Sequence, residues 1–323
     1  MTAEGAGLPR IVAVVGPTAV GKTECAVDLA ERLNGEVVNA DSMQVYRGLD
    51  IGTAKPTQQE RAGVRFHLID VVDPDQGFSA GTYCRLARAA LEDIASRGKS
   101  IILCGGTGMY VRALLHGLFE APAADRELRR RMAREEKDRP GALYERLKDV
   151  DPQKAEAISP GDMVRIVRAL EVYELTGTPL SEHHQRRGWA RKQYASFIAG
   201  LERDREDLYR RIDDRVDRMM EQGFLEEVTR LREKGHRLHL NSMQALGYKH
   251  LLEVVEGRCT LEEAVRLLKR DTRRYAKRQW TWFRHEPGCR WYRYPEEYDR
   301  LAADAQSFMA GPEPAKPHRK ESR

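Results

Sequence analysis

The chain of 323 residues has few cysteines, few aromatic residues (7%) and no long apolar run. The cysteines are Cys25, Cys84, Cys104, Cys259 and Cys289. They are scattered and form no CxxC pair, so neither a disulfide framework nor a structural zinc site is indicated, and we expect a reducing cytoplasmic location. No run approaches the length of a membrane span and no signal-peptide pattern is seen, so we expect no membrane partner.

Charge is abundant but nearly balanced. Charged residues make up 33% of the chain, the formal net charge is +5, and 41% of the residues are hydrophobic, which is enough for a globular core. The length favours about two domains, or one domain with a large insertion. The end segments 1–10 and 311–323 have little to bury, and we expect both to be disordered.

A glycine-bounded motif follows the apolar run Ile11–Val15 and precedes a predicted helix at Glu24–Leu33. Its residues are Gly16, Pro17, Thr18, Ala19, Val20, Gly21, Lys22 and Thr23. The glycines allow a sharp turn whose N–H groups point at an anion, and the helix adds its positive end. Lys22 supplies a charge, and the Thr23 hydroxyl can ligate Mg²⁺. The motif predicts a phosphate-binding loop for a di- or triphosphate; the alternative is a glycine-rich turn without a ligand.

The first third of the chain alternates between strand-like and helical patterns. Apolar runs occur at 11–15, 36–40, 66–71 and 100–104, and helical patterns occur at 24–33 and 82–96. This alternation predicts an α/β fold, a P-loop NTPase-like core with a parallel sheet. Ligands gather at the carboxyl ends of parallel strands. We therefore expect the phosphate loop, the Asp41–Gln44 segment and the Gly105–Gly108 segment to lie close together.

Two side chains at these strand ends are candidates for chemistry. Asp41 could hold Mg²⁺ or act as a general base, and the alternative is a helix or turn cap. Thr107 stands among three glycines, which let backbone and side chain approach a ligand closely. A functional role for Thr107 is supported only if the sheet places it beside Lys22 and Asp41.

The pattern of the sequence changes near residue 121 from alternating strands and helices to helices alone. Short helical stretches broken by proline and glycine predict a helical insertion at 121–193, with Asp125 and Asp162 as N-caps. The catalytic core would then comprise 11–120 and 194–300, with a further strand near Tyr194–Leu201. A long helix at Asp204–Gln222 and a mainly helical carboxyl-terminal region complete the expected fold.

Two arginine sets lie in this helical region. Arg211, Arg215 and Arg218 share one face of the helix Asp204–Gln222. They form either a diphosphate clamp or a solvated salt-bridge face with neighbouring aspartates. The segment Arg266–Arg284 has eight lysines and arginines against one acid. It forms either an RNA-binding surface, with the following Trp280, Trp282 and Phe283 stacking on bases, or an ordinary basic helix with those aromatics in the core.

Several ordered motifs together resemble the bacterial tRNA dimethylallyltransferase (IPP transferase) family. They are the segments 16–23, 41–47, 50–56, 67–70, 105–110, 165–171, 244–249 and 277–284. The resemblance runs from about Ile11 to Trp291. It implies transfer of a dimethylallyl group from dimethylallyl diphosphate to the N6 amine of the adenosine 3′-adjacent to the anticodon, in tRNAs reading codons that start with U. Diphosphate is released, and no obligatory protein partner is implied, so we expect a monomer.

The resemblance also implies residue roles. Asp41 would be the general base, and Thr107 would position the reacting groups. Lys22, Thr23, Arg215 and the loop amides would hold the diphosphate with Mg²⁺. The tRNA contacts implied are Asp41, Ser42, Met43, Gln44, Arg129, Val164, Arg165, Ile166, Val167, Arg168, Gln244, Gly247, Lys249, Lys277, Arg278, Gln279 and Arg284. Gln244 departs from the family, which often has a basic residue there.

Two other functions fit parts of the sequence. A small-molecule or nucleoside kinase would use the same phosphate loop, but the large basic helical portion exceeds what it needs. A nucleotide-gated RNA-binding protein without catalysis would also fit the loop and the basic helix. Acceptor phosphorylation by ATP without tRNA would favour the kinase. Asp41→Ala distinguishes the RNA-binding protein from the enzyme, and equal prenyl transfer by this variant and the wild type would remove Asp41 from its role.

Overall fold

The computed structural model describes residues 8–117, 122, 124–187 and 193–311. The chain divides into two compact units: unit 1 comprises residues 1–115 and 193–323, and unit 2 comprises residues 116–192. The predicted insertion, 121–193, corresponds closely to unit 2. Most of the two end segments predicted to be disordered lies outside the described residues.

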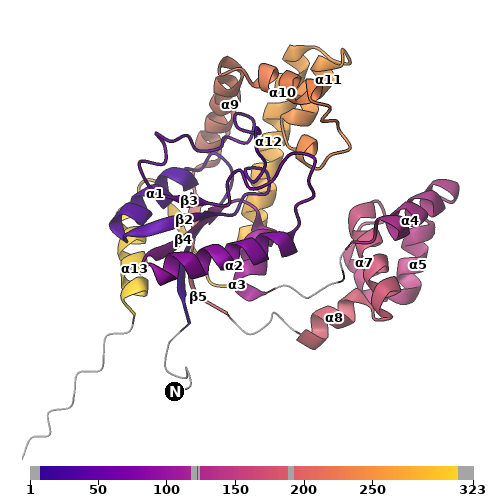
Figure 1. Cartoon of the computed structure of the whole chain (residues 1–323), viewed down its shortest axis with the longest axis horizontal. Coiled ribbons are helices and arrows are strands. Elements are labelled where there is room, and N and C mark those ends of the chain that lie inside the picture. The colour runs from indigo at the N-terminus through magenta and orange to yellow at the C-terminus, as the bar shows by residue number, and fades with distance from the viewer. Residues whose placement is uncertain (1–7, 118–121, 123, 188–192, 312–323) are drawn as a thin grey trace, which may run out of the picture. The chain divides into compact units, whose positions relative to one another are not determined.

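Unit 1 is built on a six-stranded sheet in which every neighbouring pair of strands is parallel, as predicted (Figure 1). The strands are β1 (Arg10–Val15), β2 (Gly35–Asn39), β3 (Phe66–His67), β4 (Ser100–Gly105), β5 (Ala195–Glu202) and β6 (Cys289–Arg293). Their order is β3-β2-β4-β1-β5-β6. The central strands β1 and β4 are almost continuously apolar because both of their faces are covered.

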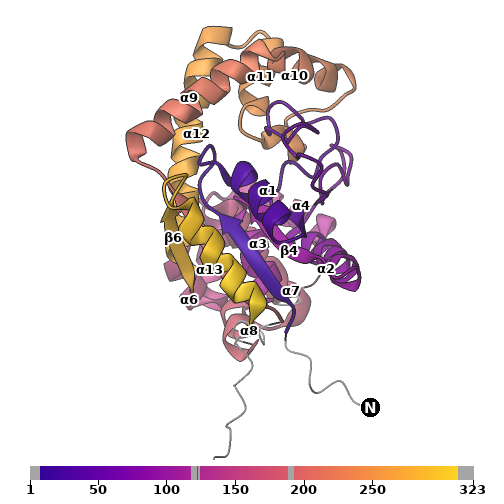
Figure 2. The ribbon, with the colours of Figure 1, turned by 90° about the vertical axis from the view of Figure 1, so that its left-hand side faces the viewer.

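Helices cover both faces of the sheet. Alternate β1 residues Val12 and Val14 pack with Leu29 of α1 (Lys22–Arg32) and Leu301 of α13 (Tyr298–Ala310) in one core cluster. Figure 2 shows α13 running beside β6. Helix α2 (Ala80–Ser96) packs on β2 and β4, and its buried residues lie outside that cluster, which places it on the other face.

A second core in unit 1 joins the carboxyl-terminal helices to the segment that follows β2. The helices are α9 (Arg205–Glu221), α10 (Phe224–Glu233), the 3₁₀ turn Ser242–Gln244, α11 (Tyr248–Val255) and α12 (Leu261–Arg284). Buried Phe224, Tyr248 and Leu268 pack there with Tyr46 and Leu49. Glu227 accepts hydrogen bonds from the backbone of residues 50–52, so this loop is fixed onto the helices.

Unit 2 is helical and has its own core. Its helices are α4 (Arg126–Asp138), α5 (Ala142–Val150), α6 (Pro152–Ala157), α7 (Met163–Thr176) and α8 (Leu180–Arg187). Met132, Leu143, Leu147, Ile166 and Leu170 form the buried centre. The predicted N-caps are confirmed, because the Asp125 and Asp162 carboxylates accept hydrogen bonds from the first turns of α4 and α7.

Three elements differ from the sequence-based predictions. The strand predicted at 66–71 ends at His67, because Leu68 and Asp70 adopt positive φ angles of 62° and 57°, which no strand tolerates. Strand β6 and helix α13 follow the region in which the sequence indicated only helices up to Trp282. The remaining connection is α3 (Gly108–His116), which begins directly after the Thr107 loop.

Among the described helices, none is both long and apolar enough to cross a lipid bilayer.

Candidate active site

The phosphate-loop motif forms the turn between β1 and α1. Gly16 and Gly21 have φ angles of 143° and 108°, conformations that residues with a side chain rarely adopt. A Cβ atom on Gly21 would lie 2.6 Å from the Tyr294 ring. Helix α1 begins at Lys22, two residues earlier than predicted, so the Thr23 hydroxyl stands in its first turn beside the positive helix end.

Two cations, Lys22 and Arg215, lie at this loop, and neither forms an ion pair within the described residues. Burial lowers the pKa of Lys22 to about 8, and the positive charge of Arg215 contributes to that shift. The Lys22 ammonium donates to the carbonyl of Pro17, 2.7 Å away. Burial also lowers the pKa of the Arg215 guanidinium. In the part of the chain that the structure describes, Arg215 has no hydrogen-bond or ion-pair partner. A site with two partly buried cations that lack an ion-pair partner is suited to bind an anion.

The Asp41 loop lies beside the Thr107 loop, as the sheet topology predicted. The Asp41 carboxylate caps its own turn, accepting from the backbone N–H groups of Met43 (2.8 Å) and Gln44 (3.3 Å). The Ser42 N–H donates to the Thr107 hydroxyl at 3.0 Å. The negative charge of Asp41 acts on the pKa values of both Lys22 and Arg215. Asp41, Lys22, Arg215 and Thr107 therefore share one site.

Helix α12 supplies two side chains to this site, Gln279 and Tyr275, that were not among the predicted catalytic or phosphate-binding residues. Gln279 is 5% exposed; its amide oxygen accepts from the Thr18 N–H (2.8 Å) and its amide nitrogen donates to the Gly106 carbonyl (3.0 Å). The Tyr275 phenol, whose pKa burial raises, lies beside Gln279 and Thr107. Gln279 was predicted to contact tRNA, and that contact stays a prediction; both ends of its amide are occupied inside the protein.

The sequence left two roles open for the arginines of α9, a diphosphate clamp or a solvated salt-bridge face, and the structure divides them between the two. Arg211 donates to the Ala19 carbonyl of the phosphate loop at 3.0 Å, and Arg203, just before the helix, donates to the Val20 carbonyl at 2.9 Å. Arg210 pairs with Asp207 on the surface, as an ordinary salt-bridge face would. Arg215 fits the diphosphate-clamp alternative, because it is half-buried and has no hydrogen-bond or ion-pair partner among the described residues.

Much of the positive charge of α12 is neutralised, by Asp271 within the counted segment and by acids outside it. Arg273 pairs with Asp213 at 2.7 Å and Lys269 pairs with Asp217 at 2.6 Å, both acids being on α9. Within α12, acids pair with Arg266, Arg270 and Arg274. Lys277 and Arg278 are exposed and lack an ion-pair partner among the described residues. Both side chains line a cavity of about 390 Å³. Arg284, near the end of α12, forms a longer ion pair with Glu202, at 3.8 Å.

The aromatic residues at the end of α12 divide between the two alternatives, because Phe283 lies in the core whereas Trp280 and Trp282 are half-buried. Phe283 is fully buried. The Arg112 guanidinium lies 4.6 Å from the Trp282 ring centre, and a Cβ on Gly108 would lie 2.1 Å from that ring. Arg284 lies over the Trp280 ring at 3.8 Å.

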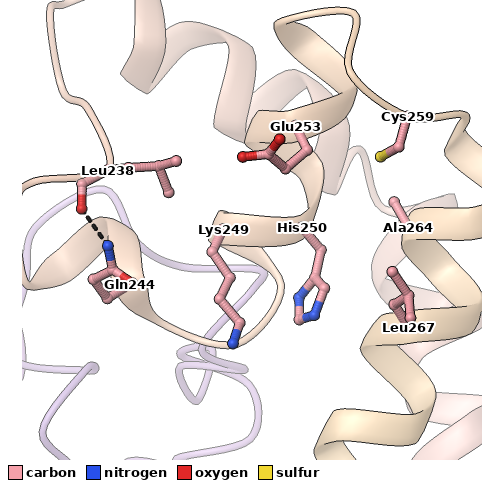
Figure 3. Close-up of a pocket in the computed structure, with 8 residues that line it drawn as sticks. All are labelled: Leu238, Gln244, Lys249, His250, Glu253, Cys259, Ala264 and Leu267. Atoms are coloured by element: carbon pink, nitrogen blue, oxygen red, sulfur yellow. Dashed lines mark hydrogen bonds between the residues drawn. The ribbon is translucent and has the colours of Figure 1, made fainter.

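Two of the three predicted tRNA contacts near α11 line a second cavity of about 280 Å³ (Figure 3). Gln244 and Lys249 line it, together with His250 and Glu253. The Gln244 amide donates to the Leu238 carbonyl. Gly247 is buried and has a φ angle of 93°, so it serves the backbone turn that starts α11.

The predicted tRNA contacts of unit 2 divide by burial. Val164 is 83% exposed and Arg165 is exposed, whereas Ile166 is fully buried. The side chain of Ile166 belongs to the core of the unit, and its neighbour Val167 packs against that core, which corrects the expectation that Ile166 contacts RNA.

Arg129 and Arg168 converge on one buried carboxylate. Glu171 is fully buried and accepts from Arg129 (2.8 Å, two bonds), Arg168 (2.5 Å) and the Asp125 N–H (2.8 Å). Burial alone raises the pKa of Glu171, but these hydrogen bonds outweigh it, so the pKa is lowered. Both guanidinium groups remain partly exposed and fixed in direction.

The variant Glu171→Ala is expected to loosen α4 and α7, because two guanidinium groups and one N–H lose their acceptor. We expect the local opening free energy to fall by about 2–4 kcal/mol. Amide hydrogen exchange of the full chain, followed by mass spectrometry, measures this for α4 and α7. Glu171→Gln, which keeps the shape and some acceptors, should lose less. Unchanged protection of both helices in Glu171→Ala would contradict the prediction.

The geometry combines an anion-binding loop, two desolvated cations, a carboxylate and a hydroxyl at the carboxyl ends of β1, β2 and β4. Such a site can bind a polyphosphate and remove a proton from a group beside it. Fold and site thus define an α/β protein in which a glycine-bounded loop before a helix lies beside a carboxylate.

Comparison with known proteins narrows this class. A model described as IPP transferase matches residues 44–286. "tRNA dimethylallyltransferase 1" of Pelobacter propionicus is 50% identical over 94% of this chain and 99% of its own length. "tRNA dimethylallyltransferase" of Geobacter sulfurreducens is 48% identical over 93% of this chain and 97% of its own length. The chain belongs to the IPP transferase family.

Solved structures are similar across nearly the whole chain. The full-length tRNA isopentenylpyrophosphate transferase of Bacillus halodurans superimposes with a TM-score of 0.69 at 43% identity, over 94% of this chain and 96% of that chain. A eukaryotic dimethylallyltransferase acting on tRNA gives a TM-score of 0.82 at 29% identity, over 96% of this chain and 81% of that chain.

Proposed function

We propose that this protein transfers a dimethylallyl group from dimethylallyl diphosphate to the N6 amine of the adenosine 3′-adjacent to the anticodon in tRNAs that read codons starting with U. Curated relatives of nearly the same length are named tRNA dimethylallyltransferases. The single observation that carries the mechanism is the meeting of Lys22, Asp41, Thr107 and Arg215 at the ends of three parallel strands.

The cations would act on the leaving group. As the bond between the allylic carbon and oxygen breaks, negative charge builds on the diphosphate. Lys22 and Arg215 are already desolvated, so they need no reorganisation to stabilise that charge. The loop amides after Gly16 and the amino-terminal end of α1 would add hydrogen bonds. The loop therefore stabilises a departing diphosphate and transfers no phosphoryl group.

The carboxylate would act on the acceptor. An adenine amine is a poor nucleophile, so its proton must leave as the new N6–carbon bond forms. Asp41 would take that proton, which balances the charge carried away by the diphosphate. Its turn holds one carboxylate oxygen against Met43 and Gln44, leaving the other oxygen for the proton. Thr107, joined to the Ser42 N–H, would position the amine.

Mg²⁺ fits the donor groups present. Thr23 offers one hydroxyl beside the anion site, and Mg²⁺ is commonly held by one or two protein oxygens together with phosphate oxygens and water. The ion would neutralise part of the diphosphate charge. No cluster of three acids, histidines or cysteines that could hold a metal occurs among the described residues, so the diphosphate would supply most other ligands.

The tRNA would be bound by an exposed, partly basic set of side chains. In unit 1, Lys277 and Arg278 carry the unneutralised charge of α12 and line the cavity near the site. In unit 2, ion pairs with Glu171 fix the direction of the Arg129 and Arg168 guanidinium groups, and Val164 offers an exposed apolar contact. The target base must leave its stack to reach Asp41, which costs a few kcal/mol and less in an unpaired loop. A monomer suffices for this arrangement.

The test is incubation with dimethylallyl diphosphate and unmodified tRNA, followed by mass spectrometry of the nucleosides. We expect N6-dimethylallyladenosine at the position after the anticodon and release of diphosphate. ATP with candidate small acceptors is the comparison reaction. Phosphorylated acceptor without any prenylated tRNA would overturn the proposal in favour of a kinase.

The binding of inorganic diphosphate is expected to take up a proton near pH 8. Lys22 has a pKa of about 8 in the free protein, and an adjacent anion raises that pKa, so the partly neutral amine becomes charged on binding. At pH 8 the uptake should approach about half a proton, and it should vanish below about pH 7.

Titration calorimetry in buffers of different ionisation enthalpy measures this uptake. Diphosphate titrates as well, so the quantity of interest is the difference between the wild type and Lys22→Arg, whose guanidinium stays charged. Equal proton uptake by the two proteins at pH 8 would contradict the assignment to Lys22.

A further inference from the structure

Gln279 occupies a position on α12 that is unusual for a polar residue. It lies on the buried stripe that includes Leu268, Ala276 and Phe283, and its side chain reaches the two loops that follow β1 and β4. Burying an amide is costly unless its groups are hydrogen-bonded, and here one bond goes to each loop. The amide is a direct link between the phosphate loop and the Thr107 loop.

The Gly106 backbone is shaped around this link. A Cβ atom on Gly106 would lie 2.1 Å from the Gln279 amide nitrogen, so the absence of a side chain there makes room for the hydrogen bond. The donor and acceptor also match only one way: the oxygen must face the Thr18 N–H and the nitrogen must face the Gly106 carbonyl. A carboxylate of the same size could satisfy the first contact but would repel the second.

Tyr275 reaches the same place from one helical turn earlier. Its hydroxyl lies beside Gln279 and Thr107, and the Thr107 hydroxyl accepts a hydrogen bond from the Ser42 N–H. The segments carrying Thr18, Gly106 and Asp41 are thereby connected through two side chains of one helix. Helix α12 also presents Lys277 and Arg278 on its exposed side.

We propose that Gln279 is a positioning residue that fixes the phosphate loop against the Thr107 loop, so that the donor's diphosphate and the acceptor amine are held in register. The inference rests on the proposed function and assigns Gln279 a role in place of tRNA contact. Gln279 touches no reacting atom in this role; it acts through the Thr18 N–H and the Gly106 carbonyl.

The experiment compares Gln279→Glu and Gln279→Met with the wild type in two binding measurements. One measures inorganic diphosphate with Mg²⁺ in the absence of tRNA, and the other measures tRNA in the absence of diphosphate. Gln279→Met loses both hydrogen bonds, and Gln279→Glu keeps only the one from the Thr18 N–H and repels the Gly106 carbonyl. Each should weaken diphosphate binding about tenfold, while tRNA binding should change less than about twofold. In steady-state assays, kcat/KM for the donor should fall and KM for tRNA should stay.

Gln306→Glu is the matched control, because it makes the same substitution on the exposed surface of α13. Gly106→Ala is the second route to the same contact, since its new methyl group would displace the Gln279 amide. If Gly106→Ala acts through that amide, it should add little to Gln279→Ala in a double-mutant cycle. Circular dichroism and thermal unfolding of each variant separate this local effect from a failure to fold.

Two results would overturn the role of Gln279. One is diphosphate affinity within about twofold of the wild type in both Gln279 variants. The other is a loss of tRNA affinity that equals or exceeds the loss of diphosphate affinity, which would return Gln279 to the RNA interface. Failure of the wild type itself to bind diphosphate would instead count against the proposed function.

Discussion

The variant Asp41→Asn is expected to lose prenyl transfer by about 10²- to 10⁴-fold in kcat, because an amide cannot accept the proton of the adenine amine. The structure makes asparagine the informative substitution. Its side-chain oxygen can still accept from the backbone of Met43 and Gln44, so the turn that follows β2 is kept. The measurement is single-turnover transfer with mass spectrometry of the tRNA nucleosides.

Binding measurements separate this loss from a loss of substrate. The tRNA affinity of Asp41→Asn should stay near that of the wild type, and diphosphate affinity should not fall, since a negative charge beside the anion site has been removed. Asp41→Ala should bind tRNA less well, because it also removes the cap of the turn. Activity of Asp41→Asn within about threefold of the wild type would show that Asp41 is not the base.

The sequence was sufficient to predict the sheet edge on which the site lies. The glycine motif, the carboxylate after one strand and the glycine-rich turn after another could be placed together from the rule for parallel strands alone. Local physics also predicted the caps at Asp125 and Asp162, because a cap and its helix are neighbours in the chain. The length of strand β3 was overestimated, because an apolar run does not reveal the positive φ angles at Leu68 and Asp70.

Contacts between distant segments could not be read from the sequence. Arg273 and Lys269 seemed to form an open basic face, but their partners, Asp213 and Asp217, lie on α9 more than fifty residues earlier. Periodicity shows which face of a helix is polar but not which acids another helix brings to it. The charge available for RNA is therefore smaller than the count implied, and it is concentrated at Lys277 and Arg278.

One signal for the Gln279 link was present in the sequence. Leu268, Ala276, Gln279 and Phe283 keep helical spacing on one face, so a glutamine stood in an otherwise apolar stripe. A polar residue in such a stripe indicates an internal hydrogen-bond partner, although the partners themselves lie more than 170 residues away. No feature of the sequence around Tyr275 indicated that its side chain lies beside Thr107.

The variant Arg215→Gln is expected to lower kcat for prenyl transfer by about 10²- to 10³-fold, the usual cost of removing one group that stabilises developing charge. Arg215 is desolvated, lies near Asp41 and Lys22, and has no ion-pair partner among the described residues. Arg210→Gln is the matched control on the same helix, because Arg210 is exposed and pairs with Asp207. We expect Arg210→Gln to keep wild-type kcat in the same assay.

Stability distinguishes this role from a structural one. Burial disfavours the charged form of Arg215, so replacing it with a neutral side chain should leave the thermal midpoint unchanged or raise it while activity falls. A structural arginine behaves in the opposite way, because its removal lowers the midpoint and leaves the residual activity of the folded fraction intact. A fall in the midpoint of Arg215→Gln with normal kcat in the folded protein would therefore assign Arg215 to the fold and remove it from the anion site.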